Sequence, residues 1–185
     1  MILASIGSIA YWSRLVKLED PIIHLNHSFQ KQSELSQYDI VTSQGRLKLS
    51  IPTQKKTRKG PYENVMIDYN STWQAEHWRS ITNSYRKSPF FLYYGYKIEA
   101  VYMTEHKTLM QFNRALLDVL YNCLKLDNEP TIDHISEVFF IKTPMLNITA
   151  YPQVFNSMLD FEENLSVLDL IFNLGPEAKD YLVSL

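Results

Sequence analysis

The spacing of hydrophobic and polar positions changes along the chain, from that of a helix to that of strands and then back to that of helices. Near the start, Ile9, Trp12 and Val16 follow helical spacing and predict a helix over residues 8–18. Because a proline lacks the N–H that a helix interior needs, Pro21 marks the point by which this helix has ended.

Short strands are predicted next. The apolar run 22–25 is typical of a buried strand. Residues 38–42 and 47–51 alternate between apolar and polar side chains around a Gln44-Gly45 turn, which predicts a β-hairpin. The alternation in 65–69 suggests another short strand.

The remainder of the chain is mainly helical in its pattern. Ser71 and Gln74 have the spacing of a capping box, in which each side chain satisfies one amide at a helix start. The side chains that then recur every fourth residue, and so share one face of a helix, are Trp73, His77, Ile81 and Tyr85. Further helices are expected to begin at Pro89, to span 108–126, to run from Ser166 to Asn173 and to span 176–183.

The order of these elements predicts the fold class. Strands first and helices later indicate an α+β fold, in which a small mixed or antiparallel sheet from the N-terminal half packs with helices from the C-terminal half. Within the ambiguous stretch 127–152, residues 138–141 resemble a strand. The length predicts a single domain over residues 1–185.

Composition excludes several classes of function. Eighteen basic against twenty acidic residues give a net charge of −2, which argues against a general nucleic-acid binder. The single cysteine, Cys123, excludes a disulfide framework and a cysteine-rich zinc site. Arg14 and Lys17 interrupt the apolar opening too early for a membrane span, and the opening lacks a basic n-region, so a cytoplasmic location is expected. No oligomeric state is predicted.

Two histidines, His24 and His27, have the H-x-x-H spacing of metal ligands on a helix. On a strand they would point to opposite faces, which defeats chelation. The expectation is therefore one buried and one exposed imidazole, with no metal and no cofactor.

Basic side chains suggest where an anion could bind. Lys31 lies beside Gln32 just after a predicted strand, where ligand-binding groups often gather, and a solvated turn is the alternative. The cations of 55–59 could steer an anionic substrate or form a solvated loop.

The segment around His77 combines aromatic, basic and imidazole groups. His77 could lie at the edge of the core, or act as an acid–base group if it faces a cleft. Arg79, with Trp78 beside it, could clamp a carboxylate or phosphate. Plain packing is the alternative for the aromatic residues.

Six segments together resemble the WbqC-like protein family. They are HSFQKQ (27–32), LKLSIP (47–52), WxxxHWRxI (73–81), SYxxSPFFxYY (84–94), YxQVF (151–155) and NLSVLDLIFNxGPEA (164–178). The resemblance runs in order over essentially the whole chain. It implies a bacterial context, because the family is named from surface-polysaccharide (O-antigen) gene clusters and its members are inferred to modify or transfer sugars. Relatives typically carry an Arg-Asn-Arg-like triplet where this chain has Leu35-Ser36-Gln37.

The first functional hypothesis is an enzyme of surface-polysaccharide or amino-sugar biosynthesis that acts on a nucleotide- or phosphate-linked sugar by group transfer. In it, Lys31 and Arg79 hold the anion, and Ser166 and Asp169 are helix-capping residues. The other assigned residues are His77 or His27 as acid–base, Trp78 or Tyr94 stacking on a sugar ring, and Gln32, Gln153 and Asn173 orienting hydroxyls.

The second hypothesis is a non-catalytic or degenerate family member that binds a ligand or partner in the same pocket. The missing triplet and the absence of a P-loop, a G-x-S-x-G or a G-x-G-x-x-G motif favour it. Both hypotheses require Lys31, Gln32, His77 and Arg79 to converge in one pocket.

Overall fold

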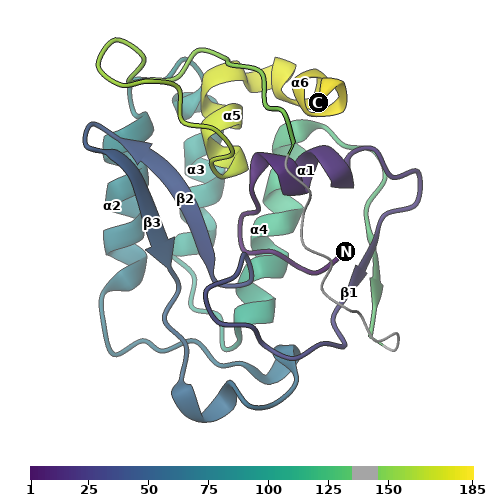
Figure 1. The fold of residues 1–185 in the computed structure, drawn as a ribbon. Coiled ribbons are helices and arrows are strands. Elements are labelled where there is room, and N and C mark those ends of the chain that lie inside the picture. The colour runs from purple at the N-terminus through teal and green to yellow at the C-terminus, as the bar shows by residue number, and fades with distance from the viewer. Residues whose placement is uncertain (135–145) are drawn as a thin grey trace.

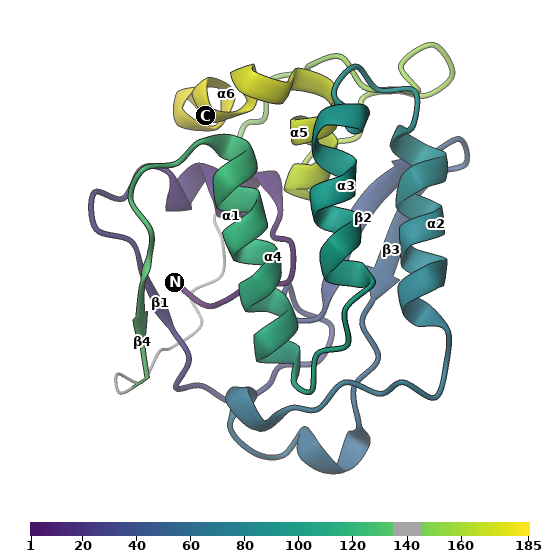
Figure 2. The same cartoon turned by 180° about the vertical axis from the view of Figure 1, so that it is seen from behind.

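A hairpin packed on helices forms the body of the molecule. The computed structural model describes residues 1–134 and 146–185 of the chain. The antiparallel hairpin of β2 (Gln37–Thr42) and β3 (Gly45–Ser50) lies in front of α2 (Trp73–Tyr85) and α3 (Phe91–Tyr102), with α4 (Leu109–Leu124) beside them (Figure 1). Seen from behind, the same three helices form the near layer (Figure 2). The predicted α+β class is confirmed.

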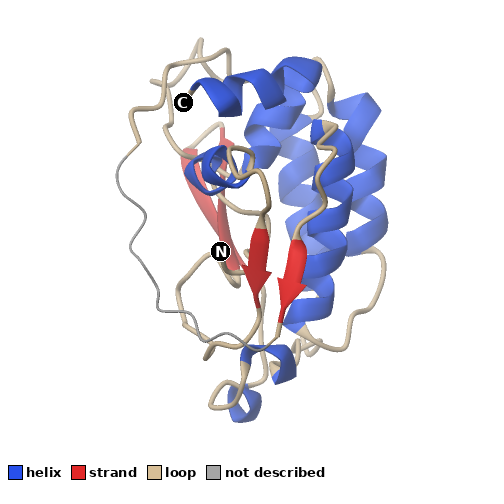
Figure 3. Cartoon of the chain, turned by 90° about the vertical axis from the view of Figure 1, so that its right-hand side faces the viewer, coloured by secondary structure: helices blue, strands red, loops and turns tan. Residues whose placement is uncertain are grey.

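The strands differ in one respect from the single sheet expected from the sequence. β1 (Ile22–His24) pairs in parallel with β4 (Thr131–Asp133), so the described strands form two separate two-stranded sheets (Figure 3). β4 comes from the second half of the chain. A partner so distant in sequence cannot be inferred from local alternation, because pairing is decided when the helices between the strands pack.

Three short helices lie in the upper half of the molecule in Figure 1. They are α1 (Ile9–Leu15), α5 (Val167–Leu174) and α6 (Ala178–Ser184), with α1 below the other two. The side chain of Ser8 caps α1 by accepting a hydrogen bond from the N–H of Tyr11 at 3.2 Å. α1 ends before residue 18 because residues 17–20 are exposed and have no core to face.

The start of α2 corrects the predicted capping box. The helix begins after Thr72, whose side chain makes no capping bond. Gln74 instead donates to the carbonyls of Tyr102 and Thr104, at 2.6 and 3.0 Å. These carbonyls lie at the end of α3, where four have no helical partner, so Gln74 joins two helices. The predicted stripe is confirmed, and its buried side chains are Trp73, His77, Ile81 and Tyr85.

A capping box does occur, at the start of α4. Thr108 accepts from the N–H of Gln111 at 3.3 Å, and the Gln111 side chain accepts from the N–H of Thr108 at 3.2 Å. The strand predicted over 65–69 is wrong, since Ile67 and Met66 form only isolated bridges. The strand-like residues 138–141 lie outside the described residues.

The buried amide of Asn113 ties the loop before β2 to α4. Its Nδ2 donates to the carbonyl of Leu35 at 2.8 Å and to the hydroxyl of Tyr62 at 2.7 Å. Asn113→Leu is expected to lower the free energy of unfolding by about 2 kcal/mol, because the buried Leu35 carbonyl loses its donor. Urea unfolding would measure this. Asn122→Leu, on the exposed face of the same helix, should cost far less, and equal losses would contradict the assignment.

Candidate functional site

Two neighbouring polar pockets, each of about 240 Å³, lie along the β2–β3 hairpin and the loop before it. Gln32 and Gln37 belong to the lining of both, so the two pockets adjoin. We call the one that contains Lys31 and Arg58 the cation pocket. The other, which contains Glu34 and its neighbours in the hairpin, is called the carboxylate pocket.

The cation pocket places two positive side chains among hydroxyl and amide groups. Lys31, Arg58, Ser36 and Ser50 line it, and no described residue contributes a carboxylate to this lining. Arg58 is held in position because its Nε donates to Thr53 Oγ1 at 2.8 Å and its Nη2 to the Thr53 carbonyl at 2.7 Å. Such a fixed guanidinium beside a lysine suits a phosphate or a carboxylate.

A tight turn presents Lys31 and Gln32 to solvent. Gln32 has φ of 56°, in the left-handed region, which is uncommon for a residue other than glycine. The turn is closed by the hydroxyl of Ser33, which donates to the carbonyl of Gln30 at 2.8 Å. The turn that carries Lys31 and Gln32 is therefore exposed to solvent and also lines the cation pocket.

The carboxylate pocket is built by three elements. Glu34 comes from the loop and Asp39, with its partner Arg46, from the hairpin. Asp39 Oδ2 accepts from Arg46 Nη1 at 3.2 Å. Burial raises the pKa of the Glu34 carboxyl, the charge of Asp39 adds to this, and hydrogen bonds to Ser8 oppose it.

The start of α5 forms the third wall. Ser166 precedes the helix, as predicted, and its N–H donates to the carbonyl of Asp39 at 2.8 Å. The side chain does not cap the helix. Its Oγ is buried, and among the described residues it has no hydrogen-bond partner. A buried hydroxyl without a partner is uncommon in folded proteins.

Neither histidine proposed as an acid–base group lines these pockets. His77 is buried on α2, where its Nδ1 lies 3.0 Å from the hydroxyl of Tyr38 and its ring meets Trp73 edge-on. Burial lowers the pKa of His77 to about 4, so the ring is neutral at pH 7. His27 is buried too, stacked on Tyr62 with ring centroids 4.8 Å apart. Both rings belong to the aromatic core.

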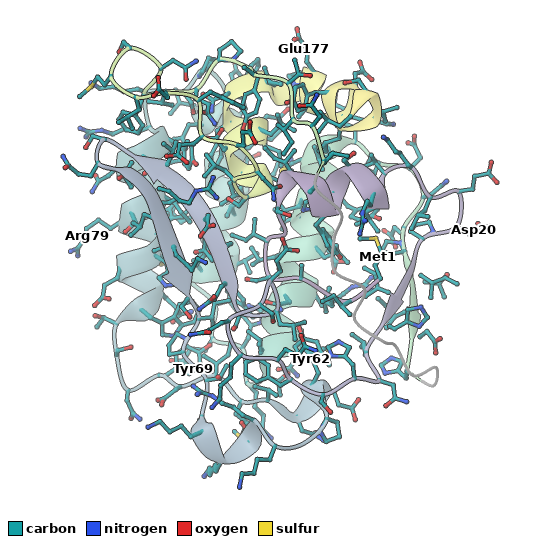
Figure 4. All side chains as sticks on the ribbon, in the orientation of Figure 1. Met1, Asp20, Tyr62, Tyr69, Arg79 and Glu177 are labelled. Carbon is teal, nitrogen blue, oxygen red and sulfur yellow. The ribbon has the colours of Figure 1, made fainter. Side chains whose placement is uncertain are left out.

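Contrary to the prediction from the sequence, Arg79 does not lie in a pocket with Lys31 and Gln32. It is exposed and projects from the outer edge of α2, away from the rest of the chain, whereas Tyr62 lies inside (Figure 4). It lines neither pocket. Trp78 stacks on Phe91 with centroids 6.0 Å apart, and Tyr94 packs near Phe90. The structure therefore does not bring Arg79 and the aromatic residues to Lys31 and Gln32.

Gln153 and Asn173 serve a buried polar cluster around Asp169. Asp169 Oδ2 accepts from the Tyr151 hydroxyl at 2.5 Å and from Gln153 Nε2 at 3.0 Å. Asn173 Nδ2 donates to the carbonyl of Asp169 at 2.7 Å. Asp169 lies in the first turn of α5, but its buried carboxylate accepts hydrogen bonds from Tyr151 and Gln153 rather than capping the helix, and burial raises its pKa to about 6.

Sequence reasoning missed most of the pocket. Glu34 and Asp39 line the carboxylate pocket, but neither belongs to a recognisable sequence motif. Glu34 lies in a loop, and Asp39 is one of the alternating polar residues of the hairpin. One signal was present. The positions that carry the Arg-Asn-Arg-like triplet in relatives include Ser36 and Gln37, which line the cation pocket, and here Arg58 supplies a cation at the same place.

Comparisons with known proteins agree with the resemblance. The sequence model described as "WbqC-like protein family" matches residues 7–142. The uncharacterized protein Rv1507c of Mycobacterium tuberculosis is 22% identical over 211 aligned positions, which cover 93% of this chain and 91% of that protein. No solved structure matches. Among the described residues, no helix is both long and apolar enough to cross a membrane.

Proposed function

The chain belongs to the WbqC-like protein family, and from this premise we propose that it binds a phosphate-linked sugar across the two adjoining pockets. The phosphate would occupy the cation pocket and the sugar the carboxylate pocket. The gene clusters for which the family is named support a role in surface-polysaccharide assembly as part of this proposal.

One observation carries the proposal: Lys31 and Arg58, distant in the sequence, line the same pocket, and its described lining contains no carboxylate. Two cations beside the hydroxyls of Ser36 and Ser50 offer a dianionic phosphate both charge and several donors. Lys48 lines the adjoining pocket and adds a third positive charge nearby.

The adjoining pocket supports the sugar half of the proposal. Its lining combines carboxyl, amide and hydroxyl groups, from Glu34, Asp39, Asn164 and Ser8 among others. A sugar ring presents hydroxyls that both donate and accept, and such groups can satisfy them. Because Gln32 and Gln37 face both pockets, one ligand can extend from one into the other.

Binding without turnover is better supported than group transfer. Neither His77 nor His27 reaches the pockets, so the acid–base group assigned from the sequence is missing there. Group transfer remains the second candidate because Glu34 places a carboxyl group, which can serve in acid–base catalysis, in the lining of the carboxylate pocket. Phosphorus NMR of a nucleotide sugar with the protein tests transfer of the sugar itself: with water as the acceptor, cleavage of the bond between the anomeric carbon and the phosphate oxygen would release a nucleoside diphosphate, whereas binding alone would not.

Titration calorimetry with glucose 1-phosphate tests the proposal. Lys31→Ala is expected to weaken binding about tenfold, and Arg58→Ala by more, because the fixed guanidinium loses a charge-assisted hydrogen bond. Arg58→Lys, which keeps the charge but not the planar fork, should fall between wild type and Arg58→Ala.

Two variants control for charge alone. Arg79→Ala removes an exposed arginine from the far side of α2, and Lys59→Ala removes a cation next to Arg58 that lines neither pocket. Both should bind as wild type does at physiological salt. If Lys59→Ala weakens binding as much as Lys31→Ala does, the loop only attracts anions and the pocket assignment fails.

A further inference from the structure

We propose that the outer face of α3 is the interface through which two copies of this chain form a symmetric dimer. The proposal does not depend on the sugar-phosphate site, since this face lies on the side of the helices that is turned away from the hairpin (Figure 2). Three features of α3 carry it: the apolar side chains exposed along it, the area that they expose, and the charges on either side of them.

The sequence of α3 is apolar on both faces. A surface helix normally has one apolar and one polar face, and a helix that is apolar all round is normally buried. The inner face is buried, and there the Tyr102 hydroxyl is hydrogen-bonded to that of Tyr38 in β2. The outer face is exposed, although Lys97 and Glu99 are the only charged residues of the helix. The helix therefore has the pattern of one that is covered on both sides.

Four large side chains form the apolar outer face, which we call the α3 patch. Their exposed fractions are 85% for Leu92, 68% for Tyr93, 62% for Tyr96 and 58% for Met103. Tyr96 is four residues from Leu92, three from Tyr93 and seven from Met103, so all four lie on one side of the helix. No other described helix or strand exposes more than one large apolar side chain. Single apolar residues on a surface are normal, whereas a contiguous patch marks an interaction site.

The area of the α3 patch suits a symmetric interface. An aromatic side chain covers about 150–250 Å², so at these exposures the four side chains present on the order of 500 Å². In a two-fold dimer both copies contribute the same patch, which gives on the order of 1,000 Å² before any flanking residue is counted, about what a specific interface needs. Because this area is near the lower limit, we expect a weak dimer with a dissociation constant on the order of 10 µM.

Opposite charges lie on the two flanks of the α3 patch. Lys97 and Glu99 are about 160° apart around the helix, with the patch between them. Burial raises the pKa of the Cys123 thiol in α4 to about 11 and the charge of Lys97 opposes this, so Lys97 lies toward α4. Glu99 is three residues before Tyr102, whose ring lies against Trp78 of α2, so Glu99 lies toward α2. Among the described residues, neither charge has an ion-pair partner.

This charge pattern is complementary to a second copy of itself. If the two-fold axis runs parallel to α3, the flank toward α4 in one copy faces the flank toward α2 in the other. Lys97 of each copy then meets Glu99 of the other. An axis perpendicular to α3 would instead place Lys97 beside Lys97 and Glu99 beside Glu99. Because unlike charges favour an arrangement and like charges oppose it, the two α3 helices pack in parallel.

Sedimentation equilibrium of the full chain, below and above the expected dissociation constant, tests the proposal. The mean mass should rise with concentration from 21.7 kDa toward twice that value. Leu92→Ala is expected to weaken association about tenfold and Tyr96→Ala about a hundredfold, because each substitution removes an apolar contact from both copies. Leu18→Ala is the matched control, since it removes an exposed leucine outside α3 and should leave the dimer unchanged.

Charge reversal tests how the two copies are arranged. Lys97→Glu and Glu99→Lys should each weaken association about tenfold, because like charges then meet on both flanks. The double variant restores both unlike pairs and should recover the affinity of the wild type. Circular dichroism shows whether each variant is folded, which separates a loss of association from a loss of structure.

Each of the other outcomes contradicts the proposal. A chain that stays monomeric at every concentration overturns it. So does a dimer that Tyr96→Ala leaves intact, because its interface then lies elsewhere. If neither charge reversal weakens the dimer, the parallel arrangement is overturned. A monomeric chain that binds phosphatidylglycerol vesicles, and loses this binding in Leu92→Ala, would show that the α3 patch meets a lipid surface and not a second copy.

Discussion

Gly175→Ala is expected to lower the free energy of unfolding by about 4 kcal/mol and the melting temperature by about 12 °C. Gly175 ends α5 with φ of 54° and ψ of −118°, a conformation that side chains other than glycine rarely adopt. A Cβ at this position would also lie 2.5 Å from two ring carbons of Phe90. Strain and overpacking therefore act together.

Two variants separate these causes in thermal unfolding experiments. Gly60→Ala is the matched control, because its Cβ would meet only one atom, the Thr57 carbonyl oxygen at 3.9 Å. In a Phe90→Ala background the collision is removed, so Gly175→Ala should cost only the backbone strain, about 2 kcal/mol. An unchanged melting temperature in Gly175→Ala would show that neither cause operates.

Asp169→Asn is expected to change how stability depends on pH. The folded-state pKa of Asp169 is about 6, above its ordinary value of 3.8, because burial disfavours the charged form. Between these two values the folded state holds a proton that the unfolded state has released, so this group lowers stability as the pH rises. Asparagine cannot ionise, and its oxygen can still accept from Tyr151 and Gln153.

The measurement is a double difference. Urea unfolding of wild type and Asp169→Asn at pH 4.5 and pH 7.5 should show the variant gaining about 2 kcal/mol relative to wild type over this interval. The comparison is needed because His77 titrates with the opposite sign: its pKa is lowered to about 4, so its contribution rises with pH. A constant difference between the two proteins at both pH values would contradict a raised pKa for Asp169.

Local patterns predicted the elements that a single face or turn defines. The four-residue spacing of Trp73, His77 and Ile81 predicted α2, because residues four apart lie on the same face of a helix. The hairpin followed from alternation around Gly45, which has φ of 94° at the turn. The capping box predicted at Ser71 does not form, because the Gln74 side chain donates to a carbonyl at the end of α3 instead. No local motif reveals that contact.

The candidate site was predictable only in part. Lys31 and Gln32 were recognised because a basic residue among amides after a strand is a local signal, and they do line the cation pocket. His77 and Arg79 were assigned to the same site from one helical segment. In the structure they face opposite ways, His77 into the core and Arg79 into solvent. They were assigned to one site because they are close in sequence. On α2, however, their side chains point to different sides of the helix, so they cannot share a pocket.

The sequence by itself determined the α+β class, the principal helices and hairpin, and the family, because each depends on local periodicity or on ordered short motifs. The tertiary structure alone decided which polar groups face one another. It brought Arg58 to Lys31 and set Glu34 beside Asp39 and the buried Ser166. The physical reason is that a binding site depends on distances between side chains on separate elements, and those distances are set only when the elements pack.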